Sequence, residues 1–261
     1  MPPLSGDAVP VTKLPSVINP VTFGLDPGGH VPVDEPKPNV RSQTRIKLFT
    51  NKAARGFLHV TGKAHHVGAV HLLTDPLNLV IADRPHRLDY HVFTSKGRVV
   101  TKGHVPAFAV SRADGSVFVI DFDTRANLAS PGWVRRKAEL KRAYLEDHGI
   151  LYNAVDDVVL RVEPLYSNVT RLHFWARQPP DREADIAVRI AIGELGLPTT
   201  VGAVRSRVHL PLTDADAACR GQFDRVLPTI GEMAVAGEIG LVHSVPLSDL
   251  TPIVHAPGAR P

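Results

Sequence analysis

Short apolar runs and alternating positions in the middle of the chain predict a series of β-strands. Residues 79–82 and 117–120 are continuous apolar runs, and residues 88–92 alternate between apolar and polar side chains. A further strand is expected over residues 105–110. The fully apolar run at 117–120 is typical of a strand that lies inside a sheet and is covered on both faces.

A helix with clear ends is predicted after the second apolar run. Ser130 is a good N-cap, Pro131 suits the first helical position, and Gly149 is a natural C-terminal stop. Residues 150–152 then predict another strand. A strand, a helix and a strand at this spacing form a crossover unit, so we expect the two strands to be parallel. The region 42–165 is therefore predicted to be an α/β domain, a mixed sheet with flanking helices.

The last third of the chain predicts a second, smaller α+β domain. A helix is expected over residues 183–195, and a short second helix follows it. A third helix is expected to be capped by Thr213, and Pro228 should bend or break it. Together with a strand over residues 238–242, these elements predict a winged-helix-like domain over residues 182–255.

Three segments are expected to lie outside these domains. Residues 1–41 contain nine prolines, which disfavour helix and remove backbone donors, so we expect an extended arm. This arm is either a plain tail or a segment that orders when it binds a partner. Residues 166–181 are expected to form a linker, and residues 256–261 a tail.

Composition limits the class of protein without identifying it. The 261 residues are 43% hydrophobic and 21% charged, which is ordinary for a globular protein. No apolar stretch approaches the roughly 18 residues that a membrane-spanning helix needs, and the N-terminus does not resemble a secretory signal. The only cysteine is Cys219, so a disulfide framework and a cysteine zinc site are excluded. These features favour a cytoplasmic protein.

The charge of the chain is positive but unevenly distributed. The formal net charge is +4. Residues 1–181 carry 23 Lys and Arg against 17 Asp and Glu, whereas residues 182–255 carry 6 against 9. Attraction to the phosphates of a nucleic acid is therefore expected mainly from the first part of the chain.

Three motifs occur in an order that resembles a known family. The first runs from Leu72-Leu73-Thr74-Asp75-Pro76 to Asp83-Arg84-Pro85, and the second is His104-Val105-Pro106-Ala107-Phe108 followed by Arg112-Ala113-Asp114-Gly115. The third lies over Phe223–Leu247. In this order they are similar to the TnsA-like endonuclease subunits of heteromeric transposases. The resemblance covers residues 45–250. It implies a restriction-endonuclease-like PD-(D/E)xK domain followed by a winged helix.

The resemblance also assigns catalytic positions, and most of them have changed. Such nucleases hold one or two Mg²⁺ ions with carboxylates, and a lysine helps to activate the attacking water. The first acid position matches Ala107, which cannot bind a metal, whether the alanine is natural or engineered. The next element matches Asp121, which suits Mg²⁺, and Asp123, which stands where lysine is expected. The helix glutamate falls near His65.

A lysine on the predicted helix offers a way to rebuild the site. The helical wheel places Lys137 and Lys141 among the apolar positions. In nucleases related by the resemblance, the catalytic lysine can occupy this helix, so Lys137 near Asp121 and Asp123 would restore the chemistry. The alternative is that both lysines pass their stems over apolar surface and reach water.

Two groups of residues are candidates for DNA contact. Four basic residues on the predicted helix suit phosphates, although they also suit a solvated helix face: Arg135, Arg136, Lys141 and Arg142. Five residues surround the second helix of the C-terminal domain, the element that would enter a major groove: Thr199, Thr200, Arg205, Arg207 and His209. The net negative charge of that domain favours instead a winged helix that docks a protein.

The sequence therefore leads to three hypotheses. The first is a DNA-binding, TnsA-like protein without nuclease activity, which needs no cofactor and acts with double-stranded DNA, a transposase-type partner or both. The second is an active endonuclease that uses Asp121 as a Mg²⁺ ligand together with Asp123 and Lys137. The third is a protein-interaction module that does not contact DNA. A homodimer is compatible with all three, no membrane partner is expected, and the resemblance implies a bacterial cytoplasm.

Overall fold

The larger part of the molecule is built on a four-stranded mixed sheet. The structure is a computed structural model that describes residues 19–34, 45–94, 96–211 and 224–256. The strands lie in the order β3 (Asn78–Asp83), β6 (Phe108–Arg112), β7 (Val117–Asp123) and β8 (Leu151–Asp156). The first three are antiparallel neighbours, whereas β7 and β8 are parallel. The predicted α/β class and the parallel crossover pair are confirmed.

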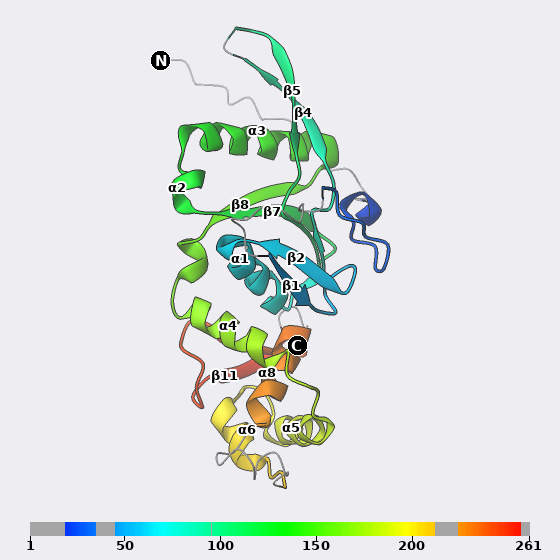
Figure 1. Cartoon of the computed structure of the whole chain (residues 1–261). Coiled ribbons are helices and arrows are strands. Elements are labelled where there is room, and N and C mark those ends of the chain that lie inside the picture. Colours follow the sequence, from blue (N-terminus) through cyan, green and yellow to red (C-terminus); the bar gives the residue numbers. More distant parts are fainter. Residues whose placement is uncertain (1–18, 35–44, 95, 212–223, 257–261) are drawn as a thin grey trace, which may run out of the picture.

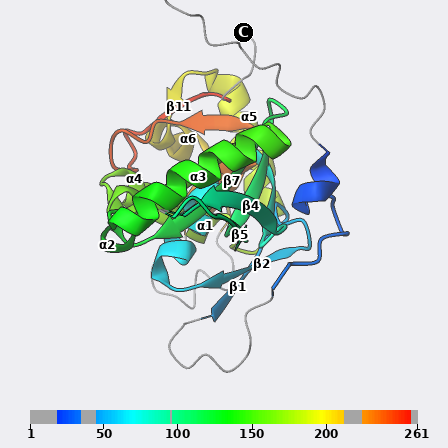
Figure 2. The ribbon, with the colours of Figure 1, turned by 90° about the horizontal axis from the view of Figure 1, so that it is seen from above.

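Two helices cover opposite faces of this sheet, α1 (Lys63–Thr74) and α3 (Pro131–His148). Because successive side chains of a strand point to opposite faces, β7 contributes to both cores. Ile120 and Phe122 pack in the cluster that includes α1, whereas Val119 packs in the cluster that includes α3. Figure 1 shows the two helices on opposite sides of β7 and β8, and Figure 2 shows α3 running across the sheet.

The ends of α3 agree with the sequence prediction. The short helix α2 (Arg125–Leu128) precedes it, and the Ser130 hydroxyl accepts a hydrogen bond from the main-chain N–H of Trp133. Pro131 occupies the first turn, and Gly149 ends the helix with a left-handed φ of 66°. Both ends therefore depend on neighbouring residues only, which is why the sequence predicts them well.

Two antiparallel hairpins flank the central sheet. One pairs β1 (Arg45–Phe49) with β2 (Phe57–Thr61), and the other pairs β4 (Leu88–Phe93) with β5 (Val99–His104). Buried and exposed residues alternate along β4, as its sequence predicts. The far end of the second hairpin projects beyond the rest of the molecule in Figure 1.

The strand expected over residues 105–110 is wrong in its first half. β5 ends at His104, the chain is irregular until residue 107, and β6 begins at Phe108. Pro106 has no N–H to give to a sheet, and the Ala107 N–H donates to the Asp121 carboxylate at 2.8 Å. This break places the Ala107 main chain beside Asp121.

Part of the predicted N-terminal arm packs against the larger domain. Residues 19–34 include the 3₁₀ turn η1 (Pro20–Phe23), and Phe23 and Leu25 are buried in the cluster that includes α3. The other residues of the predicted arm, up to 41, lie outside the described ranges. The expectation of an extended arm is therefore wrong for residues 19–34, because two isolated apolar residues show no periodicity yet fill a core.

The segment 166–181, expected to be a linker, is mostly helix α4 (Leu165–Trp175), which follows the turn η2 (Val159–Arg161). Leu172 is buried in the C-terminal core, and the Asn168 side chain hydrogen-bonds main-chain groups of residues 243–247. The linker prediction is wrong, because this segment packs against partners more than seventy residues further along the chain, which no local pattern indicates.

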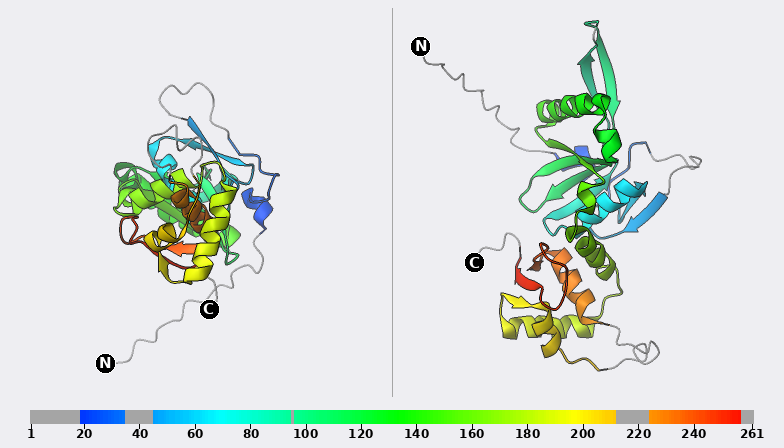
Figure 3. Two further views of the ribbon diagram at one scale, coloured as in Figure 1. Left: turned by 90° about the horizontal axis from the view of Figure 1, so that it is seen from below. Right: turned by 90° about the vertical axis from the view of Figure 1, so that its left-hand side faces the viewer.

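The C-terminal part contains helices and a small sheet. The helices are α5 (Arg182–Leu195), α6 (Val201–Arg207) and α8 (Val226–Ala236). The sheet has the order β10 (Ile239–Leu241), β11 (Pro252–His255) and β9 (Thr199–Thr200), with antiparallel neighbours. Figure 3 shows this part beside the end of the larger domain that carries α4.

Most of the third predicted helix of this part lies outside the described residues, and the helix that the structure does describe, α8, begins only at Val226. Its expected cap, Thr213, lies outside the described residues. Pro228 does not bend or break a helix as expected, because it lies in the first turn of α8, where main-chain N–H groups have no partner within the helix.

Candidate functional site

A pocket of about 330 Å³ opens where the break between β5 and β6 meets the end of β7. Its lining comes from Asp34, β2, α1, the β3–β4 connection, β5, the break that follows it, β6, β7 and α3. His65, Ala107 and Asp121 all line it. The structure therefore brings together three positions that the resemblance assigns to acidic metal ligands.

Asp121 is held by three hydrogen-bond donors. One carboxylate oxygen accepts the Ala107 N–H at 2.8 Å. The other accepts the Tyr152 hydroxyl at 2.7 Å and faces Nε2 of His104 at 2.9 Å. Only 14% of the Asp121 side chain is exposed. Asp121 thus joins β7, β8 and the break after β5.

The environment of Asp121 favours its charged form. Burial by itself would raise the pKa of this carboxyl group, but the hydrogen bonds from His104, Tyr152 and Ala107 more than offset it and hold the pKa below its usual value. The pKa of the Tyr152 hydroxyl is raised, first by burial and then by the Asp121 charge. Tyr152 therefore remains a donor.

His104 connects this carboxylate to the core under α3. Its Nδ1 lies 3.2 Å from the Tyr144 hydroxyl, and its side chain is 4% exposed. Tyr144 and Tyr152 stack with ring centroids 5.5 Å apart. Sequence reasoning assigned no role to these three aromatic residues. The signal for His104 was its place at the start of the second motif.

The other two positions that the resemblance assigns to acids carry no carboxylate. Ala107 contributes its main-chain N–H and a methyl group. His65 lies 3.4 Å from the Thr61 hydroxyl through Nδ1. Burial lowers the pKa of His65, although the charges of Asp121 and Asp123 raise it. A neutral imidazole is therefore favoured near pH 7.

Asp123 and Lys137 do not complete the site. Asp123 accepts hydrogen bonds from the Thr124 N–H at 2.7 Å and the Asn127 amide at 2.8 Å, and it is not among the lining residues. The Lys137 ammonium donates to the main-chain oxygen of Ala154 at 3.0 Å. Ala154 is the β8 neighbour of Asp121, yet no ion pair joins Lys137 to a described carboxylate.

The residues present do not fit a Mg²⁺ ion. Magnesium requires hard oxygen ligands in octahedral geometry. The carboxylates that line the pocket are Asp121, whose two oxygens already accept three hydrogen bonds, and the exposed Asp34, and the other two positions assigned to acids are an alanine and a histidine. Within the described ranges, no group of three or more His, Cys, Asp or Glu residues is placed to hold a metal ion.

The predicted basic residues of α3 divide between surface and pocket. Arg135, Lys141 and Arg142 are exposed, and Arg142 lies 3.9 Å from Glu146. The expectation that Lys141 lies on the apolar face is wrong, because Ala143 and Tyr144 take the buried positions of that turn. Arg136 is half-buried and lines the pocket.

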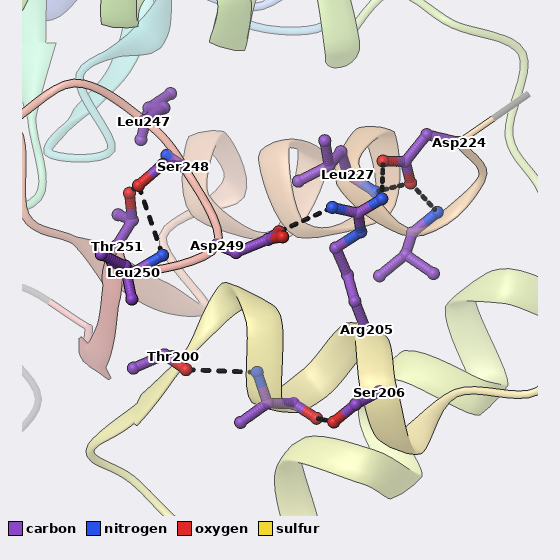
Figure 4. A network of polar contacts seen from close by, with 12 residues as sticks. Thr200, Arg205, Ser206, Asp224, Leu227, Leu247, Ser248, Asp249, Leu250 and Thr251 are labelled. Carbon is purple, nitrogen blue, oxygen red and sulfur yellow. Dashed lines mark hydrogen bonds and ion pairs between the residues drawn. The ribbon is translucent and has the colours of Figure 1, made fainter.

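In the C-terminal part, the two predicted arginines are paired with carboxylates. Arg205 lies 2.6 Å from Asp249 and 3.1 Å from Asp224, and Figure 4 shows its guanidinium between them. Arg207 pairs with Glu194 at 2.8 Å. Their charge is therefore partly neutralised within the protein.

The other three residues predicted around the second C-terminal helix have separate contacts and do not form one site with the arginines. Thr199 pairs with β11. The Thr200 hydroxyl accepts the Ala203 N–H at 3.2 Å as an N-cap, which Figure 4 also shows. His209 is exposed beyond the end of α6. Thr200 thus has a structural role that its position explains.

Neither a protein-family model nor a curated protein matches this chain. None of the helices in the described ranges has the length and apolar character that crossing a bilayer demands. The TnsA-like resemblance therefore depends on the motifs and on the positions that they occupy in the fold.

Proposed function

We propose that the chain is a TnsA-like DNA-binding protein that has lost nuclease activity. The observation that carries the proposal is the meeting of His65, Ala107 and Asp121 in one pocket. The resemblance alone selects these residues as catalytic positions. The register of the β6–β7 hairpin brings Ala107 beside Asp121, and His65 reaches them from α1, more than forty residues earlier in the chain.

The architecture of the larger part supports the same proposal. A restriction-endonuclease-like domain requires a mixed sheet with flanking helices, and the parallel pair β7–β8 with its crossover α3 supplies this arrangement. The C-terminal helices α5, α6 and α8 with their small antiparallel sheet are compatible with a winged helix.

Loss of cutting follows from the chemistry of the pocket. Phosphodiester hydrolysis by such a nuclease needs carboxylates that hold metal ions on the scissile phosphate. Ala107 and His65 cannot replace two carboxylates. The remaining acid, Asp121, is engaged by three donors. We therefore propose binding of double-stranded DNA without hydrolysis.

The two parts of the chain are proposed to have different partners. The first part carries the positive charge, and its pocket contains arginines, so it is the part proposed to contact DNA. In the C-terminal part, Arg205 and Arg207 are paired with acids. This pairing favours docking of a transposase-type protein in the bacterial cytoplasm over groove reading. Genes for a transposase and an ATPase beside this one would support that partner.

The test combines DNA binding with a cleavage assay. Anisotropy of a labelled random duplex should show binding at low salt that weakens steeply as salt rises. Supercoiled plasmid incubated with Mg²⁺ or Mn²⁺ should stay intact. Nicking that disappears in Asp121→Asn would instead identify an active endonuclease that depends on Asp121, provided that the variant retains its circular dichroism spectrum.

The remaining alternative, a protein-interaction module without DNA contact, predicts a different result. In that case the full chain would show no salt-dependent binding to the duplex, even at the lowest salt concentration. The paired arginines of α6 are the observation that favours this alternative for the C-terminal part.

A further inference from the structure

Arginines surround the pocket where metal ions would otherwise be expected. Three of the residues that line it carry a guanidinium group: Arg84, Arg87 and Arg136. The carboxylates that line it are Asp34 and Asp121. Asp121 already accepts three hydrogen bonds, so much of its charge is compensated. The pocket therefore favours an anion.

Arg84 is bound to the former catalytic position through the backbone. Its N–H donates to the Ala107 main-chain oxygen at 3.0 Å, and its left-handed φ of 46° turns the chain at the end of β3. Its guanidinium contacts the main-chain oxygen of Asp34. No described carboxylate forms an ion pair with it.

Arg87 reaches the pocket by lying over a glycine. A Cβ atom at Gly103 would be 2.3 Å from a terminal nitrogen of Arg87, so any larger residue at position 103 would displace the guanidinium. Arg87 pairs with Asp89 at 3.0 Å, but both side chains are more than half exposed. Such a pair is weak, so it leaves Arg87 able to bind another anion.

Arg136 offers a buried donor without an acceptor. Its guanidinium lies 5.2 Å from the centroid of the Trp133 ring, and its Nε is buried with no hydrogen-bond partner in the structure. A buried donor that lacks a partner is costly in a folded protein. Arg136 comes from α3, whereas Arg84 and Arg87 come from the β3–β4 connection, so the three arginines approach the pocket from two separate segments.

We infer that this pocket binds a phosphate group of a nucleic acid directly, without a metal ion. The planar guanidinium group matches the oxygens of a phosphate, and three of them supply the positive charge that metal ions supply in an active nuclease. The inference rests on the proposed function and adds which groups of the protein would contact which group of the nucleic acid. It also gives a reason for the alanine at position 107, because a carboxylate there would repel the phosphate.

The first test removes one positive charge at a time in the presence of EDTA. In anisotropy titrations with a random duplex, Arg136→Gln and Arg87→Gln should each weaken binding by roughly fivefold to tenfold at about 0.1 M salt. Each should also make the slope of log affinity against log salt shallower by about 0.9. Arg182→Gln is the control, because it removes the same charge from the C-terminal part.

The second test returns a carboxylate to the pocket. Ala107→Asp should weaken binding in EDTA by more than about tenfold, and Ca²⁺ should restore part of it, because two acids can again share a cation. Ala107→Asn has nearly the same shape without the charge and should bind within about twofold of the wild type. A melting curve for each variant excludes misfolding.

The outcomes separate the two proposals. If the wild type does not bind the duplex in EDTA, the proposed function fails. If it binds but Arg136→Gln, Arg87→Gln and Ala107→Asp bind equally well, only the phosphate pocket is refuted. Duplexes with and without 5′-phosphates show whether the bound group is a chain end or an internal phosphodiester, and an excess of inorganic phosphate at constant ionic strength tests for a free anion.

Discussion

Replacement of Asp121 by alanine should destabilise the protein strongly, although the resemblance assigns this residue to a catalytic position. The variant leaves the Ala107 N–H, the Tyr152 hydroxyl and the His104 ring without their acceptor. Each buried donor that loses its partner costs about 1–3 kcal/mol. Partial entry of water into the pocket lowers the sum, so we expect a loss of about 3–5 kcal/mol in the free energy of unfolding.

The pKa of Asp121 determines the sign of this prediction. Carboxylates kept for catalysis often destabilise a fold, because they are buried without sufficient partners. The pKa of Asp121 is instead lowered, which means that the folded protein stabilises its charge better than water does. Removal of this carboxylate should therefore lower the free energy of unfolding. Asp121 connects β7, β8 and the break before β6 through its hydrogen bonds.

The measurement is urea unfolding followed by circular dichroism, with Asp123→Ala as the matched control. Asp123 lies two residues away on the same strand, and its acceptor contacts are to the neighbouring N–H of Thr124 and to Asn127. Its replacement should cost less than about 1 kcal/mol. Equal stability of Asp121→Ala and the wild type would refute the role of Asp121 as a structural junction.

Three further predictions concern pH, packing and charge. Burial lowers the pKa of His86 to about 4. Stability should therefore fall as pH falls from 6.5 towards 4, because the unfolded chain binds the proton first. In His86→Phe the melting temperature should depend less on pH within that range. A Cβ atom at Gly68 would lie 2.4 Å from the Phe122 ring, so Gly68→Ala should lower the free energy of unfolding by about 1–3 kcal/mol in urea titrations, and an unchanged midpoint would contradict the close approach of α1 to β7. Arg205→Gln should bind the duplex within about twofold of the wild type at constant salt, because two acids already pair with Arg205. A loss of affinity as large as that of Arg136→Gln would place DNA on α6 instead.

Local signals in the sequence were sufficient for the elements whose ends and periodicity are set by near neighbours. Ser130, Pro131 and Gly149 predict α3 to the residue, because caps act within one turn. The spacing of apolar run, helix and apolar run predicts the parallel pair, because a parallel connection needs a crossover. The resemblance also selects His65, Ala107 and Asp121, which line one pocket in the structure.

Only the tertiary structure decided what these residues do. The donors to Asp121 come from residues 104, 107 and 152, and the acids beside Arg205 are residues 224 and 249. No pattern along the chain marks such pairs. The same reason explains why the sequence predicts an arm at Phe23 and a linker at helix α4, since the burial of both depends on distant partners. Periodicity and caps are short-range properties of the chain, whereas the charge of a pocket is set by segments that folding brings together.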